Sequence, residues 1–305
     1  MNADRKIFGH LIAFFTVFIW ATTFISTKIL LRDFSPVEIL FFRFVMGLLM
    51  LTIVFPHRLS GMTKKQELLM ASAGLCGVTL YFLLENIALT YSLASNIAVI
   101  VSVAPFFTAI FASLFLDGEK PGMNFFIGFI TAMAGICLIS FSGGAHFSLH
   151  LIGDVLALLA AIVWALYSVL VRKISAWGCN IIQTTRRVFL YGILLMLPAL
   201  PISGFRLGLA RFQNPVYLFN IFFLGLGASA LCFVTWSMAV KLLGAVKTSV
   251  YIYAVPVITV FTSMLVLNEK ITVQAAAGTA LALFGLLISE HKNKKPIDVK
   301  AENST

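Results

Sequence analysis

The chain of 305 residues contains little charge: only 11% of its residues are Asp, Glu, Lys or Arg, while 60% are hydrophobic. Soluble domains average about one quarter charged residues, so this composition argues against a soluble globular protein. The longest polar stretch is the tail at 291–305. Apolar runs of roughly 18 residues or more recur along the chain, each long enough to cross a ~30 Å hydrocarbon core. The sequence therefore predicts an all-α membrane protein.

Cysteine is scarce, and the motifs of several enzyme classes are missing. The cysteines lie within or beside apolar segments and form no Cys-x-x-Cys pair, so we expect neither disulfides nor a metal site. The sequence has no Walker-type phosphate-binding loop and no His-Glu-x-x-His motif. Glu85 is the one acid placed deep in an apolar segment. We expect no enzymatic activity, no direct ATP hydrolysis and no cofactor.

The charges that are present are unevenly distributed. The net charge of +10 is of the kind that marks the cytoplasmic loops of membrane proteins, and it does not predict nucleic-acid binding. With the N-terminus inside, the outer loops would hold only Arg32, Arg206, Arg211 and Lys270. This bias predicts a multi-pass protein of the cytoplasmic (inner) membrane with both termini in the cytoplasm. The apolar run after the basic N-terminus is expected to be a retained first span, and 291–305 a disordered tail.

Breaks rich in charge, proline or glycine divide the chain into ten predicted transmembrane helices. Their ranges are 8–31, 36–56, 67–91, 94–116, 122–142, 151–173, 178–200, 214–240, 244–267 and 271–290. Several connections are only a few residues long, which makes consecutive helices antiparallel neighbours.

The second half of the chain repeats the first. At shifts of 144 to 151 residues, the less common matching residues are Trp20 with Trp164, Arg43 with Arg187, Pro105 with Pro256, and Glu119-Lys120 with Glu269-Lys270. Residues 1–147 and 148–290 are therefore predicted to be two repeats of five helices each. Because five is an odd number, the second repeat must lie inverted relative to the first. Inverted repeats around a midplane site are a recurring architecture of secondary transporters.

The motifs resemble those of EamA-type transporters of the drug/metabolite transporter superfamily. Trp20 opens "WATTF", Arg43 stands alone in the second helix, and Ala104-Pro105 precedes "DGEK"; the second half repeats this with Trp164, Arg187, Pro256 and "NEK". The resemblance covers nearly the whole chain. It implies two inverted five-helix repeats around a central cavity lined by the first, third, fourth, sixth, eighth and ninth helices. It also implies transport of small metabolites, commonly amino acids or related compounds, with many exporters among the members.

Charged residues inside predicted helices are candidates for coupling or for an intramembrane ion pair. Arg43 and Glu85 each lie seven residues from the outer end of a helix, about 10 Å deep at 1.5 Å per residue. An unpaired charge at such a place costs ~2.5–3.5 kcal/mol or more, so we expect Glu85 to neutralise Arg43 or Lys28. Glu85 would then be either part of a static ion pair or an acceptor of a proton or of a cationic part of the cargo. Arg187 has no such acid, because Trp236 occupies the position equivalent to Glu85; it would extend to lipid headgroups or bind an anionic group.

Polar and aromatic residues on the predicted inward faces are candidates for cargo binding. They are Trp20, Thr23, Thr27, Tyr81, Glu85, Asn96, Ser102, Trp164, Tyr167, Trp236 and Tyr251. Those Trp and Tyr residues near helix ends would fit an interfacial belt equally well. Pro105 and Pro256 each remove a backbone hydrogen bond and are expected to kink their helices, either as hinges or as static bends that shape the cavity.

Small residues recur along the fifth and tenth predicted helices. They are Gly128, Ala132, Gly135, Gly278, Ala282 and Gly285. Small residues let membrane helices approach closely, so these two helices are expected to be scaffold or dimer contacts.

Taken together, these features predict a secondary transporter, an exporter of small polar metabolites such as amino acids, that works by alternating access. Uptake or exchange of a larger nucleotide-like metabolite is the alternative. The expected partners are a small-molecule cargo, membrane lipid and, as a candidate coupling ion, a proton. The chain would act as a monomer or a homodimer.

Overall fold

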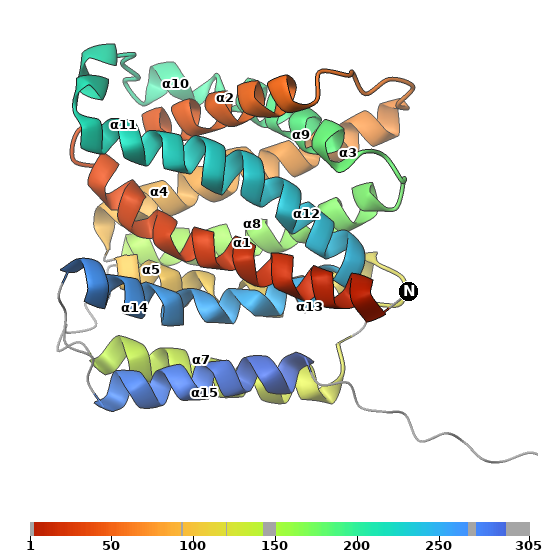
Figure 1. Cartoon of the computed structure of the whole chain (residues 1–305), viewed down its shortest axis with the longest axis vertical. Helices are drawn as coiled ribbons and strands as arrows, with labels where there is room; N and C mark the ends of the chain where they lie inside the picture. The colour runs from red at the N-terminus through yellow and green to blue at the C-terminus, as the bar shows by residue number, and fades with distance from the viewer. Residues whose placement is uncertain (1–2, 93, 120, 143–150, 268–272, 291–305) are drawn as a thin grey trace, which may run out of the picture.

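The computed structural model describes residues 3–92, 94–119, 121–142, 151–267 and 273–290, and within these ranges it contains helices and no strand. The helices lie side by side and run across the long axis of the molecule (Figure 1). Among the described residues, six helical stretches are long and apolar enough to cross a membrane: Asp4–Leu30, Pro36–Val54, Lys64–Tyr91, Ile97–Phe115, Leu151–Ser175 and Pro215–Leu243. Shorter apolar helices cover Met123–Leu138, Ala245–Thr259 and Ala276–Ser289. The prediction of an all-helical fold with helices long and apolar enough to cross a membrane is confirmed for the described residues, whereas the ten spans and the inverted repeats remain predictions.

The first half of the chain contains α1 to α7. Their bounds are α1 Ala3–Leu30, α2 Pro36–Val54, α3 Lys64–Gly74, the π-helix η1 Leu75–Leu80, α4 Tyr81–Tyr91, α5 Ala94–Val101, α6 Ala104–Phe115 and α7 Met123–Ser142. The element α2 begins where the sequence carries a start signal. Ser35 Oγ accepts a hydrogen bond from the backbone N–H of Glu38, and the Glu38 carboxylate accepts one from the N–H of Ser35. This reciprocal cap, with Pro36 in the first turn, fixes the start of the helix.

The second half contains α8 to α15. Their bounds are α8 Leu151–Ser175, α9 Ile181–Met196, α10 Ala199–Ile202, the 3₁₀-helix η2 Leu209–Gln213, α11 Pro215–Phe222, the π-helix η3 Phe223–Leu231, α12 Cys232–Leu243, α13 Ala245–Val250, the 3₁₀-helix η4 Tyr251–Tyr253, α14 Ala254–Leu267 and α15 Val273–Glu290. The predicted tail at 291–305 lies outside the described residues.

The two prolines predicted to kink their helices stand just after interruptions. The helix that α5 begins stops at Val101, and Pro105 lies in the first turn of α6. In the second half, η4 interrupts the path between α13 and α14, and Pro256 lies in the first turn of α14. Proline fits a first helical turn because the backbone N–H that it lacks has no partner there. Interruptions of the helix are present at both places; the kinks and their role as hinges remain predictions.

The small residues of α7 and α15 bring these two helices into direct contact within one chain. They lie side by side at one end of the long axis (Figure 1). A Cβ atom built on Gly128 would come within 2.5 Å of the Gly285 carbonyl oxygen, and one on Gly285 within 2.6 Å of the Gly128 oxygen. Only glycine allows backbones so close. The small residues therefore serve contact between α7 and α15.

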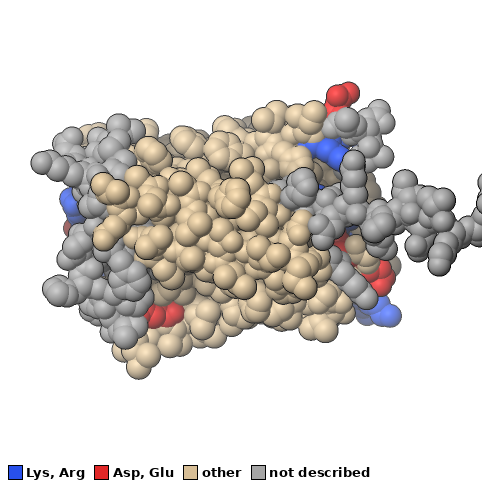
Figure 2. All heavy atoms as spheres, turned by 90° about the horizontal axis from the view of Figure 1, so that it is seen from below, with Lys and Arg blue, Asp and Glu red and all other residues tan. Residues whose placement is uncertain are grey.

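The surface between the two ends of the helices is apolar. In the face drawn in Figure 2, charged atoms lie toward the two ends and a broad uncharged area separates them. Large hydrophobic side chains are exposed along many helices, among them Phe14, Ile53, Leu114, Ile130 and Leu287. An apolar surface of this extent suits contact with lipid rather than water.

Candidate functional site

Three tryptophans that are far apart in the sequence meet in the middle of the helices. The ring centroids of Trp20 (α1) and Trp164 (α8) are 5.1 Å apart, and Trp236 (α12) lies 5.0 Å from Trp20 and 5.7 Å from Trp164. Tyr81 and Tyr167 pack on Trp164 at 4.7 and 5.0 Å. Together with Phe82 and Phe233, these residues form what we call the aromatic centre. The structure thus brings together five of the predicted cargo-binding residues from both halves of the chain.

The indole N–H groups of the three tryptophans differ in their partners. Trp20 Nε1 donates to the carbonyl oxygen of Ala228 at 2.9 Å. Ala228 belongs to the π-helix η3, and π segments frequently occur at functional sites. Trp164 and Trp236 are 3% and 0% exposed, and among the described residues no acceptor lies within hydrogen-bond distance of either Nε1 atom.

Arg43 and Glu85 are both buried beside the aromatic centre, but they do not touch. Arg43 Nε donates to Ser229 Oγ at 3.0 Å, and its guanidinium lies 4.2 Å from the Phe82 ring centroid. Glu85 accepts a hydrogen bond from the Tyr81 hydroxyl at 3.1 Å. Within the described residues no ion pair of 4.0 Å or less joins the two, so their attraction acts over a longer distance. The direct pair expected from equal depth is not formed, because Ser229 holds the arginine and Tyr81 the carboxylate.

Lys28, the other expected partner of Glu85, is hydrogen-bonded elsewhere. Its Nζ donates to the carbonyl oxygens of Leu89 at 2.6 Å and Ser92 at 3.1 Å. These carbonyls close the C-terminal end of α4, where a cation is favoured by the helix dipole.

The expectation that Arg187 has no acid was wrong. Its Nη1 lies 3.6 Å from Glu67 Oε1, and its Nη2 donates to the carbonyl oxygen of Leu59 at 2.7 Å. Arg186 donates to the carbonyl of Phe55, and Tyr191 donates to Glu67 at 2.6 Å. The acid comes from α3, which packs on α9, and not from the position that the repeat equates with Glu85. Instead of extending to lipid headgroups, both arginines hold the connection between α2 and α3.

The remaining predicted site residues lie outside the aromatic centre or bond locally. Thr23 donates to the carbonyl of Trp20 and Ser102 to that of Ala98, each within its own helix segment. Thr27 is buried on α1. Tyr251 is hydrogen-bonded to His10, about 15 Å along α1 from Trp20 at the helical rise. The side chain of Asn96 lies outside the described part of the structure.

A narrow cleft runs between α8, α9 and α12 toward the aromatic centre. Its lining consists of Tyr167, Val171, Ile174, Ser175, Cys179, Ile181, Thr184, Thr185, Val188 and Ser237, none of which is charged. The enclosed space is about 20 Å³, room for little more than one water. Tyr167 lines this cleft and also packs on Trp164 and Phe233, and Gly77 leaves space for its ring. The cleft was not expected, since the helix of α9 was not among those assigned to a cavity.

A polar contact joins both halves at the end predicted to face the cytoplasm. Glu119, from the "DGEK" motif, pairs with Arg172 at the end of α8. Its other carboxylate oxygen accepts from the backbone N–H of Ala245 at 2.7 Å, at the start of α13. Gly244 has φ +94°, and a Cβ atom there would lie 2.9 Å from the Glu119 carboxylate. We call this arrangement the inner contact; the sequence contained the motif but did not indicate its partners.

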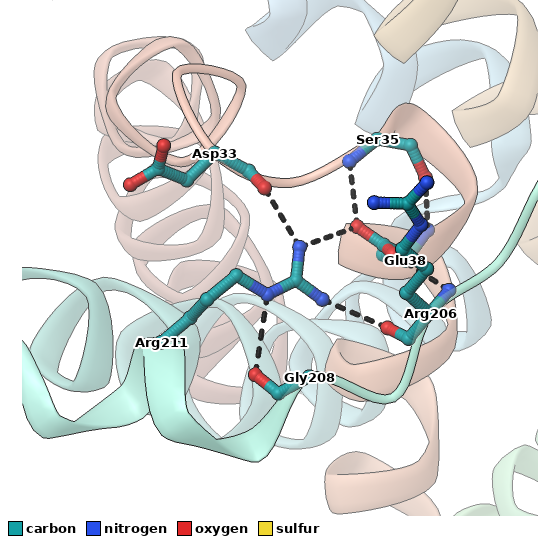
Figure 3. A network of polar contacts seen from close by, with 6 residues as sticks. All are labelled: Asp33, Ser35, Glu38, Arg206, Gly208 and Arg211. Atoms are coloured by element: carbon teal, nitrogen blue, oxygen red, sulfur yellow. Dashed lines mark hydrogen bonds and ion pairs between the residues drawn. The ribbon is translucent and has the colours of Figure 1, made fainter.

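A second polar network lies at the opposite end, predicted to face outward (Figure 3). Glu38, 3% exposed, accepts from the N–H of Ser35 and of Arg206 at 2.8 Å each and from Arg211 Nη1 at 2.9 Å. Arg211 also donates to the carbonyls of Asp33 and Arg206. The network, which we call the outer contact, fastens the connection before α11 to the start of α2.

Comparison with known proteins agrees with this architecture. The EamA-like transporter family matches residues 7–141 and again residues 151–290. An uncharacterized transporter of Archaeoglobus fulgidus is 28% identical over 93% of this chain and 97% of its own length. A probable terminal-alkyne amino-acid exporter of Streptantibioticus cattleyicolor is 25% identical over 95% of each chain.

A solved crystal structure of a protein with 18% sequence identity has the same fold. Its TM-score is 0.73, and the match covers 92% of this chain and 96% of that one. With two matches of one family that together span most of the sequence, and several apolar helices long enough to cross a bilayer, the chain belongs to the EamA-like transporter family and is a multi-pass membrane transporter.

Proposed function

We propose that this transporter exports small polar metabolites such as amino acids across the cytoplasmic membrane by alternating access, with both termini in the cytoplasm. The observation that carries the proposal is the aromatic centre, where tryptophans of both halves meet and the buried side chains of Arg43 and Glu85 lie beside them. An aromatic and apolar site with a few placed polar groups is typical of small-molecule binding. The amino-acid exporter among the relatives supports the choice of cargo.

The two polar contacts support an alternating mechanism. The aromatic centre lies between them along the helices, and each contact joins elements of the first half to elements of the second. Opening toward one side would require one contact to separate while the other holds. The π segments η1 and η3, and the interruptions before Pro105 and Pro256, occupy corresponding positions in the two halves. This correspondence supports the inverted repeat, with the two prolines as paired hinges.

Glu85 is the candidate proton acceptor in this proposal. It is 6% exposed, its carboxylate is held by one tyrosine hydroxyl, and no cation lies within 4.0 Å of it among the described residues. A carboxylate that is not locked in an ion pair is free to gain and lose a proton as the surroundings change.

Transport into proteoliposomes tests the proposal. Purified protein is reconstituted and given a panel of labelled amino acids, with and without a pH gradient. We expect movement of at least one amino acid that the gradient accelerates. Competition by unlabelled nucleotides tests the alternative cargo, since the aromatic centre would also stack a base. Failure of every cargo class under every gradient would refute transport by this chain.

A further inference from the structure

Three buried N–H donors around the aromatic centre have no hydrogen-bond partner among the residues that the structure describes. They are Arg43 Nη2, Trp164 Nε1 and Trp236 Nε1, and their residues are 1%, 3% and 0% exposed. Buried donors are nearly always hydrogen-bonded, because a donor taken out of water without an acceptor is destabilising. Unpartnered donors beside a candidate cargo site mark positions where a ligand would supply the acceptor.

The donors belong to one continuous set of touching side chains. The Arg43 guanidinium lies on the ring of Phe82, whose centroid is 4.7 Å from that of Tyr81. Tyr81 packs on Trp164, and Trp164 on Trp236. The donors therefore come from α2, α8 and α12, with one in the first half and two in the second.

The hydrogen bonds that are formed leave a defined set of donors for a ligand. Arg43 Nε donates to Ser229 Oγ, which fixes the position of the guanidinium. The Nη2 group of the same guanidinium has no acceptor among the described residues. The third tryptophan of the centre, Trp20, already donates to Ala228. The N–H groups of Trp164 and Trp236 are therefore left to donate a hydrogen bond to a ligand.

We propose that Arg43 Nη2, Trp164 Nε1 and Trp236 Nε1 bind a carboxylate group of the cargo; the proposal rests on the transport function proposed above. A carboxylate offers two oxygens with about four acceptor sites, enough for all three donors. Its negative charge balances the positive charge of Arg43, which has no acid within 4.0 Å among the described residues. Charge-assisted bonds of this kind are about twice as strong as neutral ones. An amine supplies no negative acceptor, and a carboxamide supplies a single neutral oxygen.

The position of Glu85 directs the orientation of the cargo. Its carboxylate would repel a second carboxylate that came close to it, whereas the Arg43 guanidinium attracts one. The rings touch one another in this structure, and they must separate to admit a molecule. The cleft that ends at Tyr167 provides the approach from the end predicted to face the cytoplasm.

The test compares acids with their amides in detergent-solubilised protein. The probes are the common L-amino acids, 4-methylpentanoate and the carboxamide of each, and the readout is tryptophan fluorescence, since three of the four tryptophans lie in the centre. We expect the best acid to bind about tenfold or more tighter than its amide. This preference should fall severalfold in Trp164→Phe and in Trp236→Phe, which remove the N–H but keep an aromatic ring, and should vanish in Arg43→Gln.

Trp20→Phe is the matched control, because its N–H is already bonded to Ala228. It should change fluorescence and stability but leave the ratio of acid to amide affinity unchanged. Thermal unfolding shows whether each variant folds, and the two tryptophan variants carry the test if Arg43→Gln does not. Equal binding of acid and amide, a ratio unchanged in both Trp164→Phe and Trp236→Phe, or no binding of any acid would overturn the carboxylate site. Transport in proteoliposomes would still decide the proposed function separately.

Discussion

The outer contact offers a direct measure of how strongly the two halves are fastened together. Glu38→Gln removes the negative charge while keeping the size of the side chain. In the protein the carboxylate accepts from two backbone N–H groups and from Arg211, and it is 3% exposed. Glutamine has one acceptor oxygen, and its NH₂ group would face a donor. At least one buried donor would therefore lose its acceptor.

The size of the effect follows from burial. A hydrogen bond to a charged group contributes about 1.5–3 kcal/mol, and breaking a fully buried pair costs about 3–5 kcal/mol. The Arg211 side chain is 23% exposed, so water can replace part of what it loses. We expect Glu38→Gln to lower the free energy of unfolding by about 2–3 kcal/mol by these measures.

Thermal unfolding of the purified protein in detergent is the assay, and Glu67→Gln is the matched control. Glu67 also pairs with an arginine, but the two side chains are 27% and 28% exposed and 3.6 Å apart. A pair so exposed contributes about 1 kcal/mol or less. If Glu38→Gln shifts the unfolding temperature no more than Glu67→Gln does, the assignment of the outer contact as a buried fastening is refuted. A double-mutant cycle with Arg211→Gln isolates the pair itself.

Three further perturbations test the packing, the inner contact and the coupling. Gly285→Leu should separate α7 from α15 and destabilise the protein by several kcal/mol, because a Cβ atom at Gly285 would already meet the Gly128 carbonyl. Gly122→Ala is the control and should be neutral, because a Cβ atom there would have nothing within 4 Å. Similar unfolding temperatures of the two variants would contradict the packing. Glu119→Gln should weaken the inner contact and speed the labelling of the half-buried Cys179 by a membrane-impermeant maleimide added from the cytoplasmic side. Cys137, on the exposed surface of α7, is first replaced by Ala. An unchanged labelling rate would count against an opening at this end. Glu85→Gln should abolish transport driven by a pH gradient yet retain exchange of cargo across the membrane; gradient-driven transport at the normal rate would exclude Glu85 as the proton acceptor.

The helices were predictable from the sequence because the length and hydrophobicity of each apolar run indicate a helix surrounded by lipid or protein. The start of α2 depends on four consecutive residues, Ser35-Pro36-Val37-Glu38, because the two hydrogen bonds of the cap join Ser35 and Glu38. Pro105 likewise marked the interruption before α6. The small residues of α7 and α15 indicated faces of close helix contact, but not that these two helices contact each other. The aromatic candidates at Trp20, Tyr81, Trp164, Tyr167 and Trp236 were named from the sequence as polar and aromatic residues on the predicted inward faces.

Partners across the chain were not predictable in the same way. Arg43 and Glu85 stand at similar depth, yet each bonds to a neighbour that depth does not reveal, Ser229 and Tyr81. Arg187 pairs with Glu67 of α3 because α3 packs on α9. The match between the two repeats does not predict this packing. The cleft along α9 depends in the same way on how far α8, α9 and α12 stand apart.

The sequence by itself determined that this chain is a membrane protein, that its halves are related, and that aromatic residues of both halves are candidates for one site. These properties depend on hydrophobicity and helical period, which are local. Only the tertiary structure decided which indole N–H groups are bonded, which acid meets which arginine, and where the helices leave a cleft. Those outcomes depend on atoms brought within a few ångströms of one another from distant parts of the chain, and a hydrogen bond requires both distance and direction to be met at once.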